Sequence, residues 1–323
     1  MRIVDVTTPG GPENLILTEA PTPTAGPGEV VIAVTAAGIN RADLLQRQGF
    51  YPPPPGASEV IGLEVSGHIH EVGEGVDGWA VGDPCVAILA GGGYAEYVAA
   101  PAGQVLVPPP VLDLVSAAGV TEVAATVVSN FDHVRLASGE TVLIHGGAGG
   151  IGTFAIQYAK ALGARVLTTA GSPSKLELCR ELGADVAVDY HDDWLAAVRE
   201  ATDGRGVDVI LDVMGAKYLE ANVDALAADG RLVVIGLQGG RKGTLDLSLL
   251  LTKRATVTAT SLRGRPVEQK SEIARLVAER VWPMLASGQI RLAPETRFPL
   301  DQVADAHRHL ASGENTGKVI LAV

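Results

Sequence analysis

Cysteine, basic clusters and long apolar runs are scarce or absent in this sequence. Cys85 and Cys179 are the only two thiols in 323 residues, and they are too far apart for a metal knuckle. This excludes both a disulfide framework and a structural zinc site built from four cysteines. No segment reaches the roughly 18 consecutive apolar residues of a membrane span, and the N-terminus lacks the apolar region of a signal peptide. We therefore expect a cytoplasmic protein without a membrane partner.

The charge balance excludes a second class of partner. The formal net charge is −12, and Lys and Arg form no cluster. Nucleic acids require a basic face that neutralises their phosphates, so we expect no nucleic-acid partner. If a phosphate-bearing ligand binds, backbone N–H groups and one or two placed cations must hold it.

The length of the chain favours two domains, because single cores stop growing at roughly 250–300 residues. The first part alternates short apolar runs with Gly and Pro, which predicts the strands of an antiparallel barrel or sandwich. These runs are 29–40, 60–73, 80–89 and 94–101. No repeat or low-complexity linker separates this part from the next.

From about residue 116 the pattern changes to helices and strands in alternation. Such units predict a parallel, doubly wound sheet. Expected strands are 141–146, 164–170, 185–190, 207–215, 231–238 and 255–262; expected helices are 116–136, 151–163, 172–184, 191–203 and 217–228. A long helical stretch then runs to about 286, and residues 290–323 read β–α–β. We expect this end to rejoin the first domain, with boundaries 1–118 and 265–323 for one domain and 119–264 for the other.

The glycines of residues 147–152 follow an apolar strand and precede an amphipathic helix. Gly147, Gly149 and Gly152 form the GxGxxG pattern of dinucleotide-binding proteins. The first glycine is expected to make the tight turn, the second to let the backbone approach a pyrophosphate, and the third to allow close helix–strand packing. Gly150 and Ile151 would add N–H groups at the helix N-terminus. This chain has 39 glycines, so the pattern counts only because strand and helix flank it.

The type of dinucleotide is indicated by the end of the next strand. An NAD site usually carries Asp or Glu there, to bind the ribose 2′-hydroxyl. This sequence has Gly171 and Ser172 instead, with Lys175 one turn into the following helix and Tyr190 after the next strand. A hydroxyl, N–H groups and an ammonium suit a 2′-phosphate, so we expect NADPH rather than NADH. The alternative for Lys175 is an ordinary solvated helix cation.

Beyond these patterns, the whole chain resembles the zeta-crystallin-like quinone oxidoreductases of the medium-chain dehydrogenase/reductase superfamily. The resemblance is carried by residues 139–160, from Gly139 and Glu140 through the glycine run to Gln157 and Lys160. Residues 38–76, GINRADLLQRQGFYPPPPGASEVIGLEVSGHIHEVGEGV, are especially similar to the tumour-suppressor-inducible branch. The resemblance implies an α/β protein with a GroES-like β-barrel domain and a Rossmann domain. It also implies a homodimer that pairs the last Rossmann strands, here 255–262.

The same resemblance raises the question of zinc, which alcohol dehydrogenases of the superfamily hold with a Cys in C-x-x-D and a His in G-H-E. Here the first segment reads Asn40-Arg41-Ala42-Asp43 and the second Gly62-Leu63-Glu64. An amide and a leucine replace two ligands. We therefore expect no zinc. His68 and His70 share one face of a strand and form a weaker metal candidate without a third ligand, and we expect His307 and His309 to lie on the surface.

A quinone accepts hydride without a metal, so the protein mainly has to align donor and acceptor. The resemblance places Asn40 and Tyr51 beside nicotinamide and substrate, where Tyr51 would donate a hydrogen bond to the carbonyl that gains charge. Asp43 is a candidate catalytic acid, or equally an acid that starts a helix. Residues implied near the nicotinamide are Thr126, Ile235, Gly236, Leu237, Ser261 and Leu262. Solvent is expected to supply the proton.

Two departures from the related sequences affect the cofactor side. Gly149 stands where the tumour-suppressor-inducible relatives carry serine, and the helix around Thr126 lacks the Trp common there. These differences put the substrate preference in doubt but not the chemistry. Three functions therefore stay open: NADPH:quinone reduction, zinc-free reduction of an enone or enal C=C bond, and NADPH binding without catalysis.

Overall fold

The computed structural model describes residues 1–323, and the chain divides into two compact units. The first unit comprises Met1–Ala125, Leu262–Gly288 and Leu292–Val323. The second unit comprises Thr126–Ser261 together with Gln289–Arg291. The boundaries expected from the sequence were 118 and 264, and residues 289–291 were expected in the first domain. The first boundary differs because helix α3 (Thr121–His133) runs through it.

The second unit is a six-stranded parallel sheet in the order β10-β9-β8-β11-β12-β13. Chain order therefore runs outward from β8 in one direction and from β11 in the other, so the topological switch lies between these two strands. The strands are β8 (Thr141–His145), β9 (Arg165–Ala170), β10 (Val186–Asp189), β11 (Val207–Asp212), β12 (Leu226–Val234) and β13 (Thr256–Ala259).

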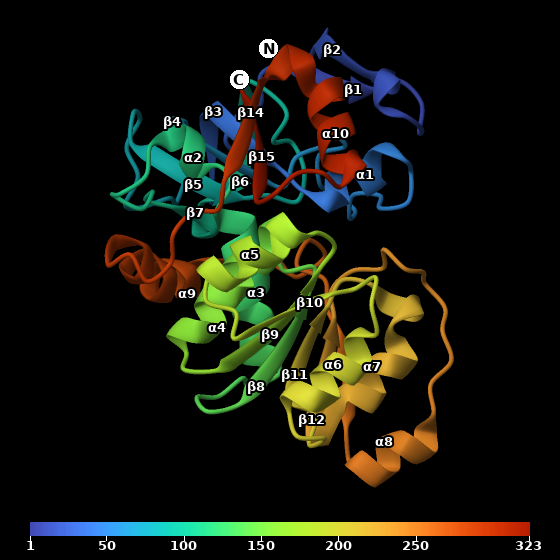
Figure 1. Ribbon diagram of the computed structural model, residues 1–323. Helices are drawn as coiled ribbons and strands as arrows, with labels where there is room; N and C mark the ends of the chain where they lie inside the picture. Colours follow the sequence, from blue (N-terminus) through green and yellow to red (C-terminus); the bar gives the residue numbers. More distant parts are fainter. The chain divides into compact units, whose positions relative to one another are not determined.

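Helices cover both faces of this sheet, which explains why its central strands are apolar throughout. Every residue of β8 and of β11 is buried, as expected for strands covered on both sides. Figure 1 shows α3, α4 and α5 on one side of the sheet and α6 and α7 on the other. The helices are α4 (Gly150–Ala161), α5 (Pro173–Glu181), α6 (Trp194–Ala201), α7 (Leu219–Ala225) and α8 (Leu247–Lys253).

The first unit is built on a seven-stranded, mostly antiparallel sheet in the order β14-β15-β3-β4-β5-β7, with β6 also paired to β3. The C-terminal strand β15 lies between β14 and β3, so the end of the chain returns to this sheet. Its elements are β1 (Arg2–Val6), β2 (Leu15–Glu19), β3 (Glu29–Ile39), α1 (Arg41–Arg47), β4 (Glu64–Val72), β5 (Pro84–Ile88), β6 (Tyr97–Pro101), β7 (Val105–Leu106), α2 (Leu114–Ala117), α9 (Val267–Ala286), β14 (Glu295–Pro299), α10 (Val303–Ser312) and β15 (Lys318–Ala322).

Two local features differ from the sequence-based expectation. Strand β12 begins at Leu226, inside the stretch 217–228 that the pattern assigned to a helix. Helix α8 was not predicted, because its seven residues are too few to show a helical period, although the carboxylate of Asp246 caps it by accepting from Ser248 N–H and Leu249 N–H. The stretch Leu114–His133 is apolar and long enough to cross a membrane, but 78% of it is buried inside the protein, as in a core helix.

Candidate functional site

The glycine loop after β8 makes a sharp turn across Gly146–Gly149. Gly146 has a φ of +75°, a conformation that glycine adopts readily, whereas Gly147 has an ordinary φ. Gly147 lies at a central position of this turn, as expected, because Gly149 N–H donates to the Gly146 carbonyl at 3.1 Å across it. Packing also requires a glycine at 147, because a Cβ there would lie 2.1 Å from Thr168 Oγ1 on β9.

The other two glycines of the pattern differ in how much space surrounds them. A Cβ at Gly152 would lie 2.3 Å from the carbonyl oxygen of Gly146, so only glycine lets the helix approach the turn. A Cβ at Gly149 would meet nothing nearer than 3.5 Å, and its φ of −80° suits any residue. The space at Gly149 is thus open. The serine of the tumour-suppressor-inducible relatives would fit there, and nothing in the packing requires the glycine.

The first turn of α4 presents unused donors. Thr153 N–H already bonds to the carbonyl of Gly149, but the N–H groups of Gly150, Ile151 and Gly152 have no backbone acceptor. Three aligned N–H groups at a helix N-terminus attract an anion, and the helix dipole adds to this attraction. A cradle of this kind, open at Gly149, fits the pyrophosphate of a dinucleotide.

A buried hydrogen-bond chain that sequence reasoning missed supports this turn. Gly146 N–H donates to Thr169 Oγ1, which also lies 3.1 Å from His145 Nδ1, and His145 Nε2 lies 2.7 Å from Asn222 Oδ1. Burial lowers the pKa of His145 to about 4, so the ring is neutral and donates from only one nitrogen. The chain ties the turn to β9 and α7. A lone histidine ending an apolar strand gave no sequence signal of this role.

The structure brings together the residues expected at the 2′-phosphate. Ser172 caps α5, and its hydroxyl accepts from Lys175 N–H. The Tyr190 hydroxyl lies over Gly171, where a Cβ would be only 2.2 Å away from it. Tyr190 is 44% exposed, so its ring is available to a ligand. The acid beside it, Asp189, is engaged by His191 through both the backbone N–H and the ring.

The residues expected near the nicotinamide in the second unit also follow strand ends. The loop Ile235–Leu237 comes directly after β12 and packs on the turn after β11, where a Cβ at Gly236 would lie 2.7 Å from Val213 O. Ser261 follows β13 in the same way, whereas Leu262 belongs to the first unit. Because the carboxyl ends of parallel strands share one edge, these loops lie on the same edge as the glycine turn. Thr126 is buried in α3.

Asn40 lies at the start of α1, and both ends of its side-chain amide are occupied. Lys318 Nζ donates to Asn40 Oδ1 at 2.8 Å, and Asn40 Nδ2 donates to Glu64 Oε1 at 3.0 Å. The ammonium also reaches Glu64 Oε1 at 2.6 Å. Each of these three side chains thus contacts the other two. Asn40 follows β3, Glu64 begins β4 and Lys318 begins β15. Neither Lys318 nor Glu64 was singled out from the sequence.

The Glu64 carboxylate is fully buried, and the backbone around it is shaped to accept it. Its second oxygen accepts from Glu122 N–H at 2.8 Å. A Cβ at Gly38 would lie 2.3 Å from Glu64 Oε1, so the glycine on β3 is what lets the carboxylate reach Asn40. Burial of a charge is costly unless it is paired and hydrogen-bonded, and here both conditions are met.

Asp43 lies in the interior of the first unit, beneath the Asn40 turn. Its Oδ2 accepts from Asn40 N–H at 2.7 Å and from the Tyr94 hydroxyl at 3.1 Å. Burial raises the pKa of Asp43 to about 7. These contacts describe an acid that starts a helix and holds the turn. They favour a positioning role over direct catalysis.

The expectation that His307 lies on the surface is wrong, because its ring is fully buried on α10. His307 Nε2 lies 3.2 Å from the Tyr94 hydroxyl, and Nδ1 lies 3.4 Å from Arg47 Nη1. Arginine only donates, so Nδ1 accepts and Nε2 carries the proton. Burial lowers the pKa of His307 to about 3, which keeps it neutral. The amphipathic period of this helix places position 307 inward, and that signal was overlooked.

Tyr51 lies in the loop after α1, half-buried, with a guanidinium against its ring. Arg263 Cζ is 5.3 Å from the ring centroid, and Arg263 Nη1 donates to the Tyr51 carbonyl at 3.2 Å. The two residues are far apart in the sequence, and nothing in the pattern around Arg263 pointed to this contact.

The residues at the positions where alcohol dehydrogenases of the superfamily hold zinc do not fit the metal. Asn40 offers an amide oxygen already bound by the Lys318 ammonium, and Leu63 offers no donor atom. The positive charge beside Asn40 therefore comes from the side chain of Lys318. His68 and His70 are exposed on β4, and no group of three His, Cys, Asp or Glu is arranged to hold a metal ion.

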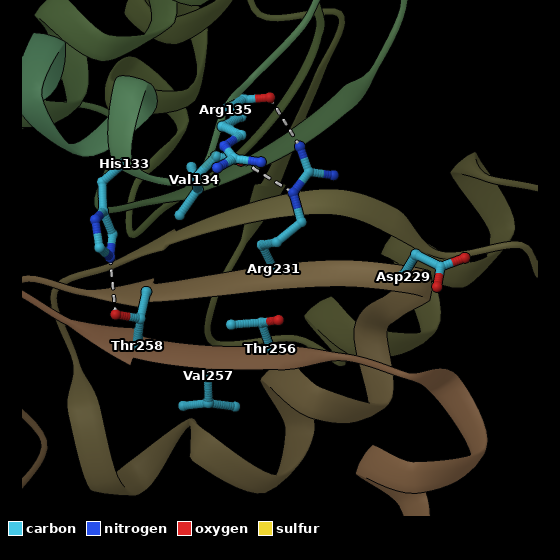
Figure 2. Close-up of a pocket in the computed structure, with 8 residues that line it drawn as sticks. All are labelled: His133, Val134, Arg135, Asp229, Arg231, Thr256, Val257 and Thr258. Carbon is cyan, nitrogen blue, oxygen red and sulfur yellow. Dashed lines mark hydrogen bonds between the residues drawn. The ribbon is translucent and has the colours of Figure 1, made fainter.

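A separate hollow of about 620 Å³ lies in the second unit, between the C-terminal end of α3 and strands β12 and β13. Figure 2 shows its lining, in which His133 Nε2 lies 2.9 Å from Thr258 Oγ1 and Arg231 bonds to the carbonyl of Arg135. The residues are His133, Val134, Arg135, Asp229, Arg231, Thr256, Val257 and Thr258. None of them is a predicted site residue.

Comparison with known proteins places both units. Residues 26–111 match the family described as the alcohol dehydrogenase GroES-like domain, and residues 150–279 match the zinc-binding dehydrogenase family. The quinone oxidoreductase of Pseudomonas aeruginosa is 33% identical, over 97% of this chain and 96% of its own. The chain also matches mycobacterial polyketide synthases, but it spans only 14% of the length of one from Mycobacterium tuberculosis at 34% identity over 91% of this chain.

Solved structures agree with this placement. The Escherichia coli quinone oxidoreductase complexed with NADPH has a TM-score of 0.91 and 28% identity, with full coverage of both chains. The JamJ enoyl reductase has a TM-score of 0.88 and 25% identity, covering 99% of this chain and 98% of its own. The glycine cradle, the strand order and the relatives lead to one conclusion. The chain belongs to the medium-chain dehydrogenase/reductase superfamily and is related to the quinone oxidoreductases.

Proposed function

We propose that the protein is an NADPH:quinone oxidoreductase that transfers hydride to a quinone without a metal. The observations that carry the proposal are the free N–H cradle of α4 and, in the first unit, an Asn40 whose amide oxygen is already bound by the Lys318 ammonium. The similarity to a quinone oxidoreductase over 97% of the chain supports the choice of acceptor. We propose a cytoplasmic location.

The preference for NADPH rests on the end of β9. Gly171 and Ser172 carry no acid, Ser172 presents a hydroxyl and the first N–H groups of α5, and Tyr190 lies over the glycine. Lys175 supplies a cation one turn away. Asp189, which precedes Tyr190, accepts hydrogen bonds from His191 rather than from Ser172 or Lys175. A 2′-phosphate would therefore meet donors rather than repulsion.

The chemistry asked of the protein is mainly alignment. When bound, the reduced nicotinamide supplies the hydride, and a quinone accepts it without a Lewis acid. In the first unit, the Lys318–Glu64 pair fixes the orientation of Asn40, and Tyr51 is the candidate donor to the acceptor oxygen. Asp43 holds the turn on which Asn40 lies. Solvent supplies the proton.

A second candidate function is reduction of an activated C=C bond, and the similarity to an enoyl reductase structure favours it. The same hydride adds to an enone or enal, and the same tyrosine would bind its carbonyl oxygen. The third possibility, cofactor binding without catalysis, requires an intact cradle but no turnover.

The test is oxidation of NADPH, with NADH in parallel, against an ortho-quinone, a para-quinone and an α,β-unsaturated ketone, with and without chelator. We expect turnover of the quinones with NADPH that chelator does not change. Turnover of the ketone alone would assign the protein to the C=C reductases. Tight NADPH binding without any turnover would favour the non-catalytic role.

We also propose that two copies pair through β13. This strand is the end of the sheet, and an unpaired edge is a template for another strand. Leu247 and Leu251 of the adjoining α8 are 65% and 79% exposed, which adds an apolar surface beside that edge. Light scattering should give a dimer for the wild type and a monomer for L247E/L251E. The control Val81→Glu changes an exposed apolar residue of the first unit and should remain dimeric.

A further inference from the structure

Arg263 is a buried cation without a carboxylate partner. Its side chain is only 5% exposed, Nε donates to the Ala90 carbonyl at 2.7 Å, and Nη1 donates to the Tyr51 carbonyl. The third nitrogen, Nη2, is buried and has no hydrogen-bond partner. Buried charges are normally paired, so a guanidinium that bonds only to carbonyls calls for an explanation.

A second cation lies near it and increases the imbalance. Lys270 on α9 is also 5% exposed and forms no ion pair. Burial lowers the pKa of Lys270, and repulsion from the charge of Arg263 lowers it further. Two buried cations that repel each other destabilise the fold unless a negative charge joins them during function.

The acids around Arg263 do not neutralise it. The only acid with a noticeable effect on the guanidinium, besides the Tyr51 phenol, is Asp43. Both contacts of that carboxylate are to Asn40 N–H and the Tyr94 hydroxyl, and burial raises its pKa. Arg263 is therefore left facing the ring of Tyr51, with Lys270 adding charge of the same sign.

We propose that Tyr51, backed by Arg263 and Lys270, forms a site for a negatively charged oxygen of the acceptor. The inference rests on the proposed function: hydride addition to a quinone leaves a negative charge on a ring oxygen, which a solvent proton then neutralises. Tyr51 would donate the hydrogen bond, and Arg263 is a positioning residue that holds the Tyr51 carbonyl and ring and supplies positive charge behind them. Preorganised charge of this kind stabilises a developing oxyanion.

The site also defines a class of ligand. A compound of quinone shape that already carries an anionic ring oxygen should bind more tightly than its neutral counterpart. 2-Hydroxy-1,4-naphthoquinone, which is an enolate at neutral pH, and 1,4-naphthoquinone form such a pair. Their binding to the full chain saturated with NADP⁺ is measured by calorimetry and needs no turnover, so it is read independently of the proposed activity.

Four variants separate charge from packing. Arg263→Gln should weaken binding of the enolate by about tenfold, because a buried unit charge acts strongly on another charge away from water, while binding of the neutral quinone should change by less than about twofold. Arg263→Lys keeps the charge and should retain most of the enolate preference. Lys270→Gln removes a charge without removing any hydrogen bond and should weaken binding of the enolate about threefold. Arg275→Gln, on the exposed face of the same helix, is the matched control and should change neither ligand.

The double variant decides whether Arg263 acts through Tyr51. Tyr51→Phe and Arg263→Gln should be non-additive, with Arg263→Gln costing little enolate affinity once the hydroxyl is gone. Equal weakening of both ligands by Arg263→Gln and Lys270→Gln, or strictly multiplicative effects in the double variant, would overturn the proposal. If wild-type protein binds the enolate as described but reduces no acceptor, the proposed activity fails and the anion site stands.

Discussion

Lys318 Nζ donates to the side-chain oxygen of Asn40 at 2.8 Å, across 278 residues of sequence. Lysine can only donate, so this contact fixes which end of the amide is oxygen and turns Asn40 Nδ2 toward Glu64. The orientation of Asn40 is thus set by a buried ion pair rather than by its own helix. Several of the following predictions depend on such long-range contacts.

Removing the Lys318 ammonium should lower the stability of the protein. Lys318→Met leaves the Glu64 carboxylate, which has no exposed surface, without its cation. Breaking a buried pair in this way costs about 3–5 kcal/mol of stability. Urea denaturation measures the loss, and the double variant Glu64→Gln/Lys318→Met should recover much of it. A loss below about 1 kcal/mol, as for a surface pair, would contradict the buried pairing.

The pH dependence of stability should change when Asp43 is replaced. Its folded pKa of about 7 is above the ordinary 3.8, so between these values the native state holds a proton that the unfolded chain has lost. Asp43 therefore stabilises most below pH 3.8, and its contribution is lost as the pH rises through 7, by roughly 4 kcal/mol.

His307 has the opposite effect, because its folded pKa of about 3 is below the ordinary 6.5. Its contribution is present above pH 6.5 and is lost as the pH falls toward 3.

The variant Asp43→Asn keeps an oxygen for Asn40 N–H and removes the titrating group. The free energy of unfolding of this variant should therefore rise with pH, as the contribution of His307 does. Denaturation at several pH values measures the free energy of unfolding. If this free energy changes with pH in the same way for wild type and variant, the assignment is contradicted.

The second and third glycines of the pattern, Gly149 and Gly152, should differ in their tolerance to a side chain. Gly152→Ala places a methyl group 2.3 Å from the Gly146 carbonyl and should abolish cofactor binding or folding. Gly149→Ala adds the same group where the space is open and should change the NADPH dissociation constant by less than about threefold. Fluorescence titration with NADPH compares the two. Equal losses of NADPH affinity in the two variants would contradict this prediction and show that the cofactor itself fills the open space at Gly149.

Cofactor preference should respond to one charge at the end of β9. Ser172→Asp preserves the cap of α5, because Asp is as good a cap as Ser, but places a carboxylate where the 2′-phosphate is expected. The dissociation constant for NADPH should rise about tenfold or more and that for NADH should not. Ser312→Asp, which adds the same charge in the first unit, is the control. An equal rise for both cofactors would place the 2′-phosphate elsewhere.

The second unit could be predicted well from sequence because its information is local. Strands such as 141–146 are apolar throughout, helices such as 151–163 have a clear period, and the glycines lie between them. The positive φ of Gly146 was not predicted, because spacing does not reveal backbone dihedrals. The short helix α8 had too few turns to show a period.

The first unit was harder to predict because its polar interior joins distant segments. The contact of Tyr51 with Arg263, the burial of His307 and the contact of Asn40 with Lys318 all depend on which strands are neighbours. No pattern within a window of a few residues contains that information. The family resemblance supplied Asn40 and Tyr51 as site residues, but it did not supply the cations behind them.

The place of β15 in the first sheet has a consequence for the order of folding during synthesis. Residues 126–261 are continuous, so the second unit has nearly all of its sheet before the ribosome reaches the last quarter of the chain. The first unit must wait, because Lys318–Ala322 form an internal strand between β14 and β3. Until those last residues emerge, β3 has an open edge and Glu64 has no cation. Synthesis of residues 318–322 therefore completes both the sheet and the orientation of Asn40.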